Sequence, residues 1–309
     1  MHIRVLGSAA GGGYPQWNCN HPNSRRARTG DPAAPPRTQS SIALSANGED
    51  WVLFNASPDL RQQIFDNDIL HPSGELRASP IRAVVLTNAD VDHVAGLLNL
   101  RESQAFNLYA TPRVLSVLAA NSIFNVLNPA FVDRRAMVLD EPLALVGADD
   151  TPLGITIIPF AVPGKVALWL EDESQGENFG TVDEDTIALE VQDDDGQTKF
   201  FYMPACARMT DELAGRLRGA PLVFFDGTLW VDDEMVRERV GTKTGKRMGH
   251  MSVSGDTGTM AALADLDIAR KVFIHINTTN PILIDGTPER REAETRGWEV
   301  SYDGMAIEV

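Results

Sequence analysis

A short segment in the first third of the chain combines two carboxylates with an imidazole. Asp90, Asp92 and His93 lie together within residues 88–93. Carboxylate oxygens and imidazole nitrogens are ligands that zinc and iron use in proteins. An Asp-x-Asp-His segment is also typical of an acidic turn that caps a helix, because aspartate there satisfies free backbone N–H groups. The segment alone therefore leaves two interpretations open, a metal site and a helix cap.

Three further residues of ligand type lie in the second half of the chain. His275 and Asp226 each end an apolar run, and His250 follows a loop punctuated by glycine. A histidine in a buried strand is often only a hydrogen-bonded core residue. A buried carboxylate, however, must be paired, protonated or bound to a metal. The coincidence favours one shared site, so we predict catalytic roles for Asp92, His93, His275, His250 and Asp226.

Other chemistry-bearing patterns are missing or incomplete. Residues 7–13 and 241–247 are rich in glycine, but neither has the spacing of a P-loop or a dinucleotide-binding loop. There is no Gly-x-Ser-x-Gly motif, and Cys206 has no neighbouring base in the sequence. A covalent nucleophile is therefore not expected.

The elements that must position these residues alternate between strands and helices, which indicates a layered α/β or α+β architecture. A strand over 82–87 and a helix over 92–99 would flank the Asp90 turn. Residues 18–38 lack periodicity and are predicted as a long loop, and 171–185 as a second, acidic loop. The other expected strands are 2–6, 41–45, 51–55, 155–160, 166–170, 186–192, 199–203, 106–110, 221–226 and 271–276, and the other expected helices are 58–65 with Ser57 as N-cap, 112–120, 210–217 and 256–264.

Length and composition limit the class of protein. The chain has 309 residues with 43% hydrophobic content, which suits a single domain over 1–309. A net charge of −16 argues against nucleic acid as a partner, and the acidic runs within 171–173, 183–185 and 193–195 are expected to be solvated. Two cysteines and the lack of a long apolar run predict a cytoplasmic protein without stable membrane insertion.

Several segments taken together carry a family resemblance. They are residues 6–20, 36–41, 55–59, 248–250 and 275–281. Their sequences closely resemble the family of coenzyme PQQ (pyrroloquinoline quinone) synthesis protein B, within the metallo-β-lactamase superfamily. The resemblance extends from Met1 to Met305 and implies a four-layer αββα sandwich.

The resemblance also implies a modified metal site. The superfamily usually carries His-x-His-x-Asp-His and a later Pro-Gly-His loop, but this chain has Asn88, Asp90 and Lys165 at the corresponding positions. The other site is matched completely by Asp92, His93 and His275. Two histidines and one carboxylate suit non-haem iron(II), and zinc is the alternative ion. Asn88, Asp90, Asp226 and His250 would then act as extra ligands, as residues that orient the ligands, or as proton carriers.

An early loop departs from the family pattern. The relatives carry Cys-x-Cys-x-x-Cys there, which resembles a structural zinc site, whereas this chain has Cys19, His21 and Ser24. Cys19 and His21 remain candidate zinc ligands, but serine is a poor replacement for cysteine. Without the ion, residues 18–38 would have to be held by packing and hydrogen bonds.

The activity implied by the resemblance is iron- and O2-dependent hydroxylation of the tyrosine ring in the crosslinked Glu–Tyr precursor of PQQ. Arg37, Lys243 and Lys246 are expected to pair with the carboxylates of this small-molecule substrate, and other enzymes of the pathway are candidate partners. Two alternatives stay open. One is a carrier of PQQ or its precursor towards the periplasm, and the other is a single-metal hydrolase.

Overall fold

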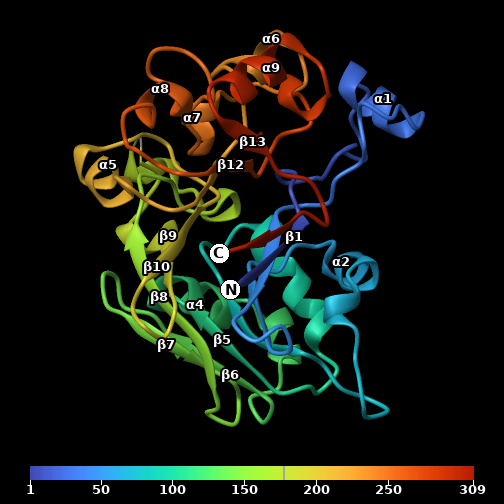
Figure 1. The fold of residues 1–309 in the computed structure, drawn as a ribbon, viewed down its shortest axis with the longest axis vertical. Coiled ribbons are helices and arrows are strands. Elements are labelled where there is room, and N and C mark those ends of the chain that lie inside the picture. Colours follow the sequence, from blue (N-terminus) through green and yellow to red (C-terminus); the bar gives the residue numbers. More distant parts are fainter. Residues whose placement is uncertain (177) are drawn as a thin grey trace.

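Two mixed β-sheets form the centre of the protein (Figure 1). The computed structural model describes residues 1–176 and 178–309. Within these residues each sheet has seven strands, in the orders β14-β1-β2-β3-β4-β5-β6 and β13-β12-β11-β10-β9-β8-β7. The strands are β1 (His2–Gly7), β2 (Ser41–Ser45), β3 (Trp51–Phe54), β4 (Ile81–Val85), β5 (Phe106–Ala110), β6 (Val132–Ala136), β7 (Leu143–Val146), β8 (Pro152–Ala161), β9 (Ile187–Gln192), β10 (Thr198–Met203), β11 (Val223–Asp226), β12 (Lys271–Ile274), β13 (Trp298–Val300) and β14 (Ala306–Glu308).

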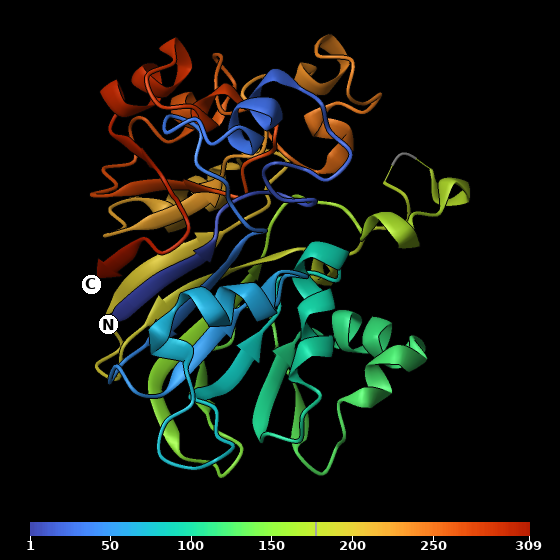
Figure 2. The ribbon, with the colours of Figure 1, turned by 90° about the vertical axis from the view of Figure 1, so that its right-hand side faces the viewer.

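Helices cover the outer faces of both sheets (Figure 2). Side chains of α2 and α4 pack on the first sheet, and those of α5, α8 and α9 pack on the second. The four-layer αββα sandwich is therefore confirmed. The helices are α1 (Pro22–Arg28), α2 (Leu60–Asp66), α3 (Val91–Val94), α4 (Pro112–Ala120), α5 (Asp211–Leu217), α6 (Glu234–Arg237), α7 (Gly245–Met248), α8 (Thr259–Ala262) and α9 (Pro288–Thr295).

Alternation along the strands builds three apolar layers. Phe224 of β11 points between the sheets, whereas its neighbours Val223 and Phe225 point to the outer helices. In β4, Val85 lies between the sheets and Val84 faces α4. This period of two lets strands such as β4 and β11 bury side chains on both of their faces.

The helices in the described part of the chain are short. The longest, α4, has nine residues. A bilayer requires roughly 20 apolar residues in one helix, and none of these helices is long and apolar enough to cross it.

The strand expected at 166–170 is wrong. Leu168–Leu170 forms a single turn of 3-10 helix instead. It contacts the turn that contains Asp90, because the N–H of Leu168 donates to Asp90 Oδ1 (3.1 Å) and Trp169 Nε1 donates to the carbonyl of Ala89 (3.3 Å). The apolar run therefore lies across the mouth of the site, and β8 pairs directly with β9.

The two helices flanking the early strands also differ from expectation. The helix predicted from 58 begins at Leu60 with Asp59 at its N-cap, and Ser57 Oγ accepts the N–H of Asp59. The helix predicted over 92–99 is divided into α3 and a 3-10 helix over Ala95–Leu100. The N–H of Gly96 donates to the carbonyl of Ala56 (2.8 Å) and not to the preceding turn, which interrupts the α-helical hydrogen bonds.

Residues 18–38 are not a continuous loop, because α1 lies inside them. Pro22 occupies the first turn of α1, and the His21 ring accepts the N–H of Asn23 as a cap. The helix is attached to the segment that follows His275: Ser24 Oγ lies 2.8 Å from Thr278 Oγ1 and is fully buried. Hydrogen bonds and packing thus hold this segment in place.

The acidic runs are only partly solvated, contrary to expectation. The side chain of Glu171 is 10% exposed and pairs with Arg247, and that of Asp185 is 4% exposed and pairs with Arg113 (3.0 Å). These carboxylates are buried because each has an arginine partner. Some of the acidic residues in these runs are therefore neutralised by arginines within the fold and are not free surface charges.

We expect Ser24→Ala to lower the free energy of unfolding by about 1–3 kcal/mol, because the buried Thr278 hydroxyl loses its partner. Thr29→Ala is the matched control at the exposed end of α1, where we expect a change within about 0.5 kcal/mol. Urea denaturation followed by circular dichroism measures both. Equal losses in the two variants would contradict the proposed anchoring of α1.

Candidate metal centre

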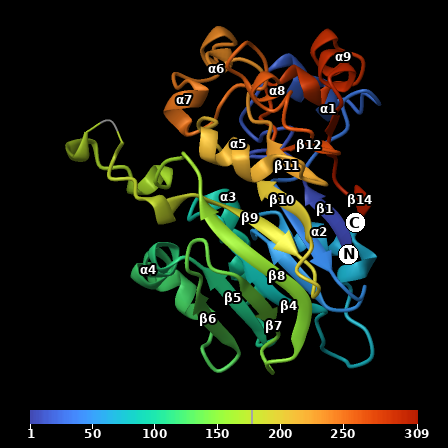
Figure 3. The same cartoon turned by 60° about the vertical axis from the view of Figure 1, so that its left-hand side comes forward.

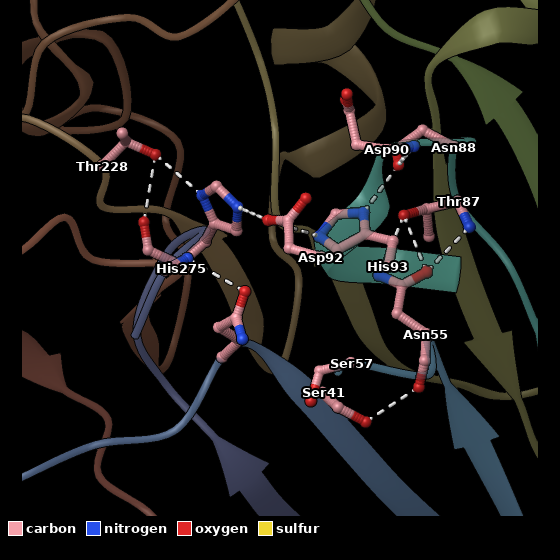
Figure 4. Close-up of polar contacts among 12 residues, drawn as sticks. Ser41, Asn55, Ser57, Thr87, Asn88, Asp90, Asp92, His93, Thr228 and His275 are labelled. Carbon is pink, nitrogen blue, oxygen red and sulfur yellow. Dashed lines mark hydrogen bonds and ion pairs between the residues drawn. The ribbon is translucent and has the colours of Figure 1, made fainter. Parts of the chain in front are cut away.

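The turn after β4 and the end of β12 bring three ligand-type side chains together from different sheets (Figure 4). Asp92 and His93 lie in α3, and His275 follows the last residue of β12. His275 Nε2 lies 3.0 Å from Asp92 Oδ2, and His93 Nε2 lies 3.9 Å from the same oxygen. The Asp92 carboxylate therefore sits between the two imidazole rings, as Figure 4 shows.

His275 occupies an unusual backbone conformation. Its φ is +59°, in the left-handed region that residues other than glycine rarely adopt. Backbone hydrogen bonds hold both sides, because the N–H of Ile276 donates to Ser8 (3.0 Å) and that of Gly227 donates to Ile274 (2.7 Å). Such strain persists only where the surroundings enforce it. Here it turns the imidazole out of the strand direction and towards Asp92.

Each imidazole is oriented through its Nδ1 atom. Asn88 Oδ1 lies 2.8 Å from His93 Nδ1, and Thr228 Oγ1 lies 2.9 Å from His275 Nδ1. Because the Thr228 hydroxyl donates to Asp226 Oδ1 (2.6 Å), it accepts from His275. This arrangement directs the Nε2 atom of both rings towards Asp92. His275 Nε2 donates to Asp92 Oδ2, and it would release that proton on binding a metal, as histidine ligands do.

A test of fit to a metal is the hydrogen bonding of these nitrogens. His93 Nε2 is buried and has no hydrogen-bond partner among the residues that the structure describes. A buried nitrogen without a partner costs about 1–3 kcal/mol, and a metal ion would satisfy it. Asp92, His93 and His275 offer ligand atoms that all lie within 4.8 Å of one another. The three residues therefore fit a divalent metal.

A second cluster adjoins the first. Asp226 Oδ2 lies 2.7 Å from His250 Nδ1, and the His250 ring stacks on His275 with centroids 5.1 Å apart. The buried Asp226 carboxylate also accepts the N–H groups of Cys206 (3.1 Å) and Thr228 (3.0 Å). These hydrogen bonds support the orienting role considered for Asp226. The ligand atoms of Asp226, His250 and His275 also lie within 4.8 Å of one another, so this group too could hold an ion.

Thr228 is the residue that the sequence analysis missed. Its hydroxyl connects Asp226 with His275 and also lies 3.1 Å from His250 Nδ1. The only signal in the sequence is its position two residues after Asp226. A threonine next to a glycine is too common for that position to be informative.

The charges of the centre are set by burial and by these contacts. Burial alone would raise the pKa of Asp92, but the neighbouring His93 and the hydrogen bond from His275 hold it below its usual range. Burial lowers the pKa of His93 to about 4. Burial, together with the charge of Asp92, raises the pKa of Asp90. At neutral pH the centre thus offers an ionised Asp92 and a neutral His93, the states that metal ligands require.

A cavity of about 300 Å³ opens beside the centre. Its wall includes Asp90, His250, Lys165 and Lys243, in addition to the three ligand-type residues. Lys246 borders a neighbouring cavity of about 1240 Å³. The predicted substrate-binding lysines are thus on or near the site.

Arg37 does not line either cavity. Its guanidinium is buried, donates to the carbonyl of Ser301, and has its pKa lowered to about 10 by burial. The expectation that Arg37 contacts a substrate carboxylate in the cavity is therefore not met. This side chain fixes the C-terminal segment instead.

The remaining candidate residues lie apart from this centre. His21 Nε2 lies 3.1 Å from Glu238, and neither Cys19 nor His21 belongs to a group of three ligand-type residues in the described part of the chain. Burial raises the pKa of Cys206 to about 12, in agreement with the expectation that it is not a nucleophile.

We expect Asn88→Ala to weaken metal binding by about 10- to 100-fold, because the His93 ring loses the acceptor that fixes its orientation. Asn88→Asp retains an acceptor and should preserve affinity to within several-fold. Competition with a chromophoric chelator measures both affinities, and thermal unfolding checks the folded state. An unchanged affinity in a folded Asn88→Ala protein would contradict this role.

Comparison with known proteins identifies the family. A beta-lactamase superfamily domain matches residues 50–276. Coenzyme PQQ synthesis protein B from Gluconacetobacter diazotrophicus is 57% identical, and that from Xanthomonas euvesicatoria is 54% identical, each over 307 residues and 99% of both chains. The 1.98-Å crystal structure of Zn(2+)-bound PqqB from Methylobacterium extorquens is 50% identical, with a TM-score of 0.94 over 100% of both chains. The chain therefore belongs to the coenzyme PQQ synthesis protein B family of the beta-lactamase superfamily.

Proposed function

We propose that this chain is an oxygenase of PQQ biosynthesis that uses iron and O2 to hydroxylate the tyrosine ring of the crosslinked Glu–Tyr precursor. The observation that carries the proposal is the set of two imidazoles and one carboxylate formed by Asp92, His93 and His275 beside a cavity. Such a set suits iron(II), because it leaves coordination positions open for O2 and substrate. The Zn2+ bound by the Methylobacterium extorquens relative supports a metal in this family.

The positions that correspond to the other superfamily site support oxygenation rather than two-metal hydrolysis. Asn88 and Lys165 stand where the superfamily pattern has histidine ligands, and neither has an imidazole. Asn88 forms a hydrogen bond with His93, and Lys165 forms an ion pair with Glu171. Asp90 accepts the N–H of Leu168. Superfamily hydrolases that hold two metals use them together on the attacking oxygen. A centre built for one ion suits a reaction in which one redox-active metal acts.

The roles of the chain's own residues follow from their contacts. Asp92, His93 and His275 would hold the iron, which when bound would supply the redox chemistry with O2. Asn88 and Thr228 keep the two imidazoles in the ligand orientation. Because His250 Nδ1 is engaged by Asp226, its Nε2 is the atom available to accept a hydrogen bond from a phenol in the cavity.

A reconstitution experiment tests the proposal. One oxygen atom of O2 enters the ring and the other is reduced to water, so the reaction requires a two-electron reductant. Protein is loaded with iron(II) without O2, mixed with ascorbate as reductant and with the precursor or a tyrosine analogue, and then exposed to O2. We expect ring hydroxylation, detected by mass spectrometry, together with O2 consumption. His275→Ala should abolish both hydroxylation and O2 consumption, because one metal ligand is lost. His71→Ala is the control and should change neither, because His71 is exposed and its ring forms a hydrogen bond with the carbonyl of Phe65. An unmodified ring at full iron occupancy would refute the oxygenase.

A single-zinc hydrolase is the second candidate, and the zinc in the Methylobacterium extorquens relative favours it. Zinc-loaded protein would then cleave ester or phosphodiester substrates, and Asp92→Ala would remove that activity. Measuring both reactions on the same preparation separates the two candidates.

A further inference from the structure

Two cationic side chains contact one carboxylate next to the cavity, and a third lies nearby. Arg247 donates two hydrogen bonds to Glu171, at 3.0 Å to Oε1 and 2.7 Å to Oε2, and Lys165 Nζ also contacts Oε1. Lys243 is close enough for its charge to lower the pKa of Glu171 further. Lys165 and Lys243 both line the cavity. The cluster of Lys165, Lys243, Arg247 and Glu171 thus contains more positive than negative charge.

This surplus stands out in a chain whose net charge is −16. Lys165 also lies near Asp90, where its positive charge opposes the rise in the pKa of that carboxyl. A ligand bearing carboxylates would be repelled by most of the protein and attracted by this wall. Charge-assisted hydrogen bonds from lysine and arginine to a carboxylate are among the stronger polar contacts.

Lys165 stands at a position that belongs to the metal site in the superfamily pattern. Lys165 follows Pro163 and Gly164, at the point where the superfamily pattern has a histidine ligand. The chain therefore places a fixed ammonium group where its superfamily relatives place part of a metal site. An ammonium group keeps a positive charge that attracts anions, but it lacks the redox and Lewis-acid chemistry of a metal.

Glu171 belongs to a segment that extends from the body of the protein. Figure 3 shows this segment in yellow-green beside α3, running through the 3-10 turns Leu168–Leu170 and Glu173–Gln175. Its contacts with the body include the Glu171 ion pairs and the Phe179 ring, which lies 3.8 Å from the Arg247 guanidinium carbon. The side chain of Glu171 is 10% exposed, so it reaches inward to the cations.

We propose that Lys165, Lys243 and Arg247 form the binding site for a carboxylate of the substrate, and that Glu171 is the internal carboxylate which the substrate displaces. In the free protein Glu171 pairs with Lys165 and Arg247 and holds these two cations together. A ligand carboxylate exchanges for it, so neutral ligands gain nothing from the exchange. Glu171 thus acts as a specificity filter, and the substrate class, an aromatic compound with several carboxylates, rests on the proposed function.

Binding of PQQ to the zinc-loaded protein tests this inference, because PQQ carries three carboxylates and zinc does not support oxidation. Isothermal titration calorimetry should show that Lys165→Met and Lys243→Met each weaken PQQ binding by about tenfold. Glu171→Gln should strengthen it several-fold, since the competing charge is removed. The trimethyl ester of PQQ should bind all variants alike.

Lys199→Met is the matched control, because Lys199 pairs with Asp193 away from the cavity. It should leave PQQ binding unchanged. Weaker binding by Glu171→Gln, or unchanged binding by both Lys165→Met and Lys243→Met in folded protein, would overturn the inference. Lys243→Met keeps both Glu171 ion pairs, so it tests the site even where Lys165→Met fails to fold.

These results are independent of the oxygenase assay. Charge-dependent PQQ binding without ring hydroxylation would support the carboxylate site and refute the proposed activity. Ring hydroxylation together with PQQ binding that is unchanged by substitution of Lys165, Lys243 and Glu171 would support the proposed activity and refute the carboxylate site.

Discussion

The contact between Asp92 and His275 joins the two sheets at one edge of the sandwich, and the candidate centre depends on it. The carboxylate and the imidazole come from different sheets and lie 183 positions apart in the chain. A buried carboxylate is costly to desolvate unless neighbouring groups stabilise its charge. His93 and His275 provide this stabilisation from two sides. The charge of Asp92 is therefore stabilised from both sides only when the two sheets pack so that His275 reaches it.

The two imidazoles are held in different ways. His93 is oriented by Asn88, only five positions earlier in the same turn, whereas His275 is oriented by Thr228, which lies 47 positions away and is itself fixed by Asp226. The first arrangement is local, so it forms with the turn. The second requires β11 and β12 to pair in register before the hydroxyl and the ring can meet.

The attachment of α1 extends this network to the N-terminal region. Ser24 contacts Thr278, three residues after His275, and Asn23 Nδ2 donates to the carbonyls of Thr278 and Thr279. In this chain hydrogen bonds hold the same segment against the residues that follow the candidate ligand.

The strand pattern made most of the fold predictable. Runs such as 41–45 and 106–110 coincide with β2 and β5, because their buried faces leave a clear pattern of apolar residues. The pattern failed at 166–170, where an apolar run contacts the turn that precedes α3 instead of joining a sheet. It also missed α1, whose helix depends on capping by His21 and on contacts from a distant segment.

The sequence by itself determined the layered fold and the ligand types, because residue identity and local periodicity carry that information. Its resemblance to a known family implied in addition that Asn88, Asp90 and Lys165 stand where the superfamily pattern has histidines. Only the tertiary structure decided that Thr228 orients His275, that Arg37 is buried away from the cavity and that Glu171 meets Lys165 and Arg247. The physical reason is that hydrogen bonds and ion pairs act over a few ångströms in space. Separation along the chain does not reveal which groups will lie that close.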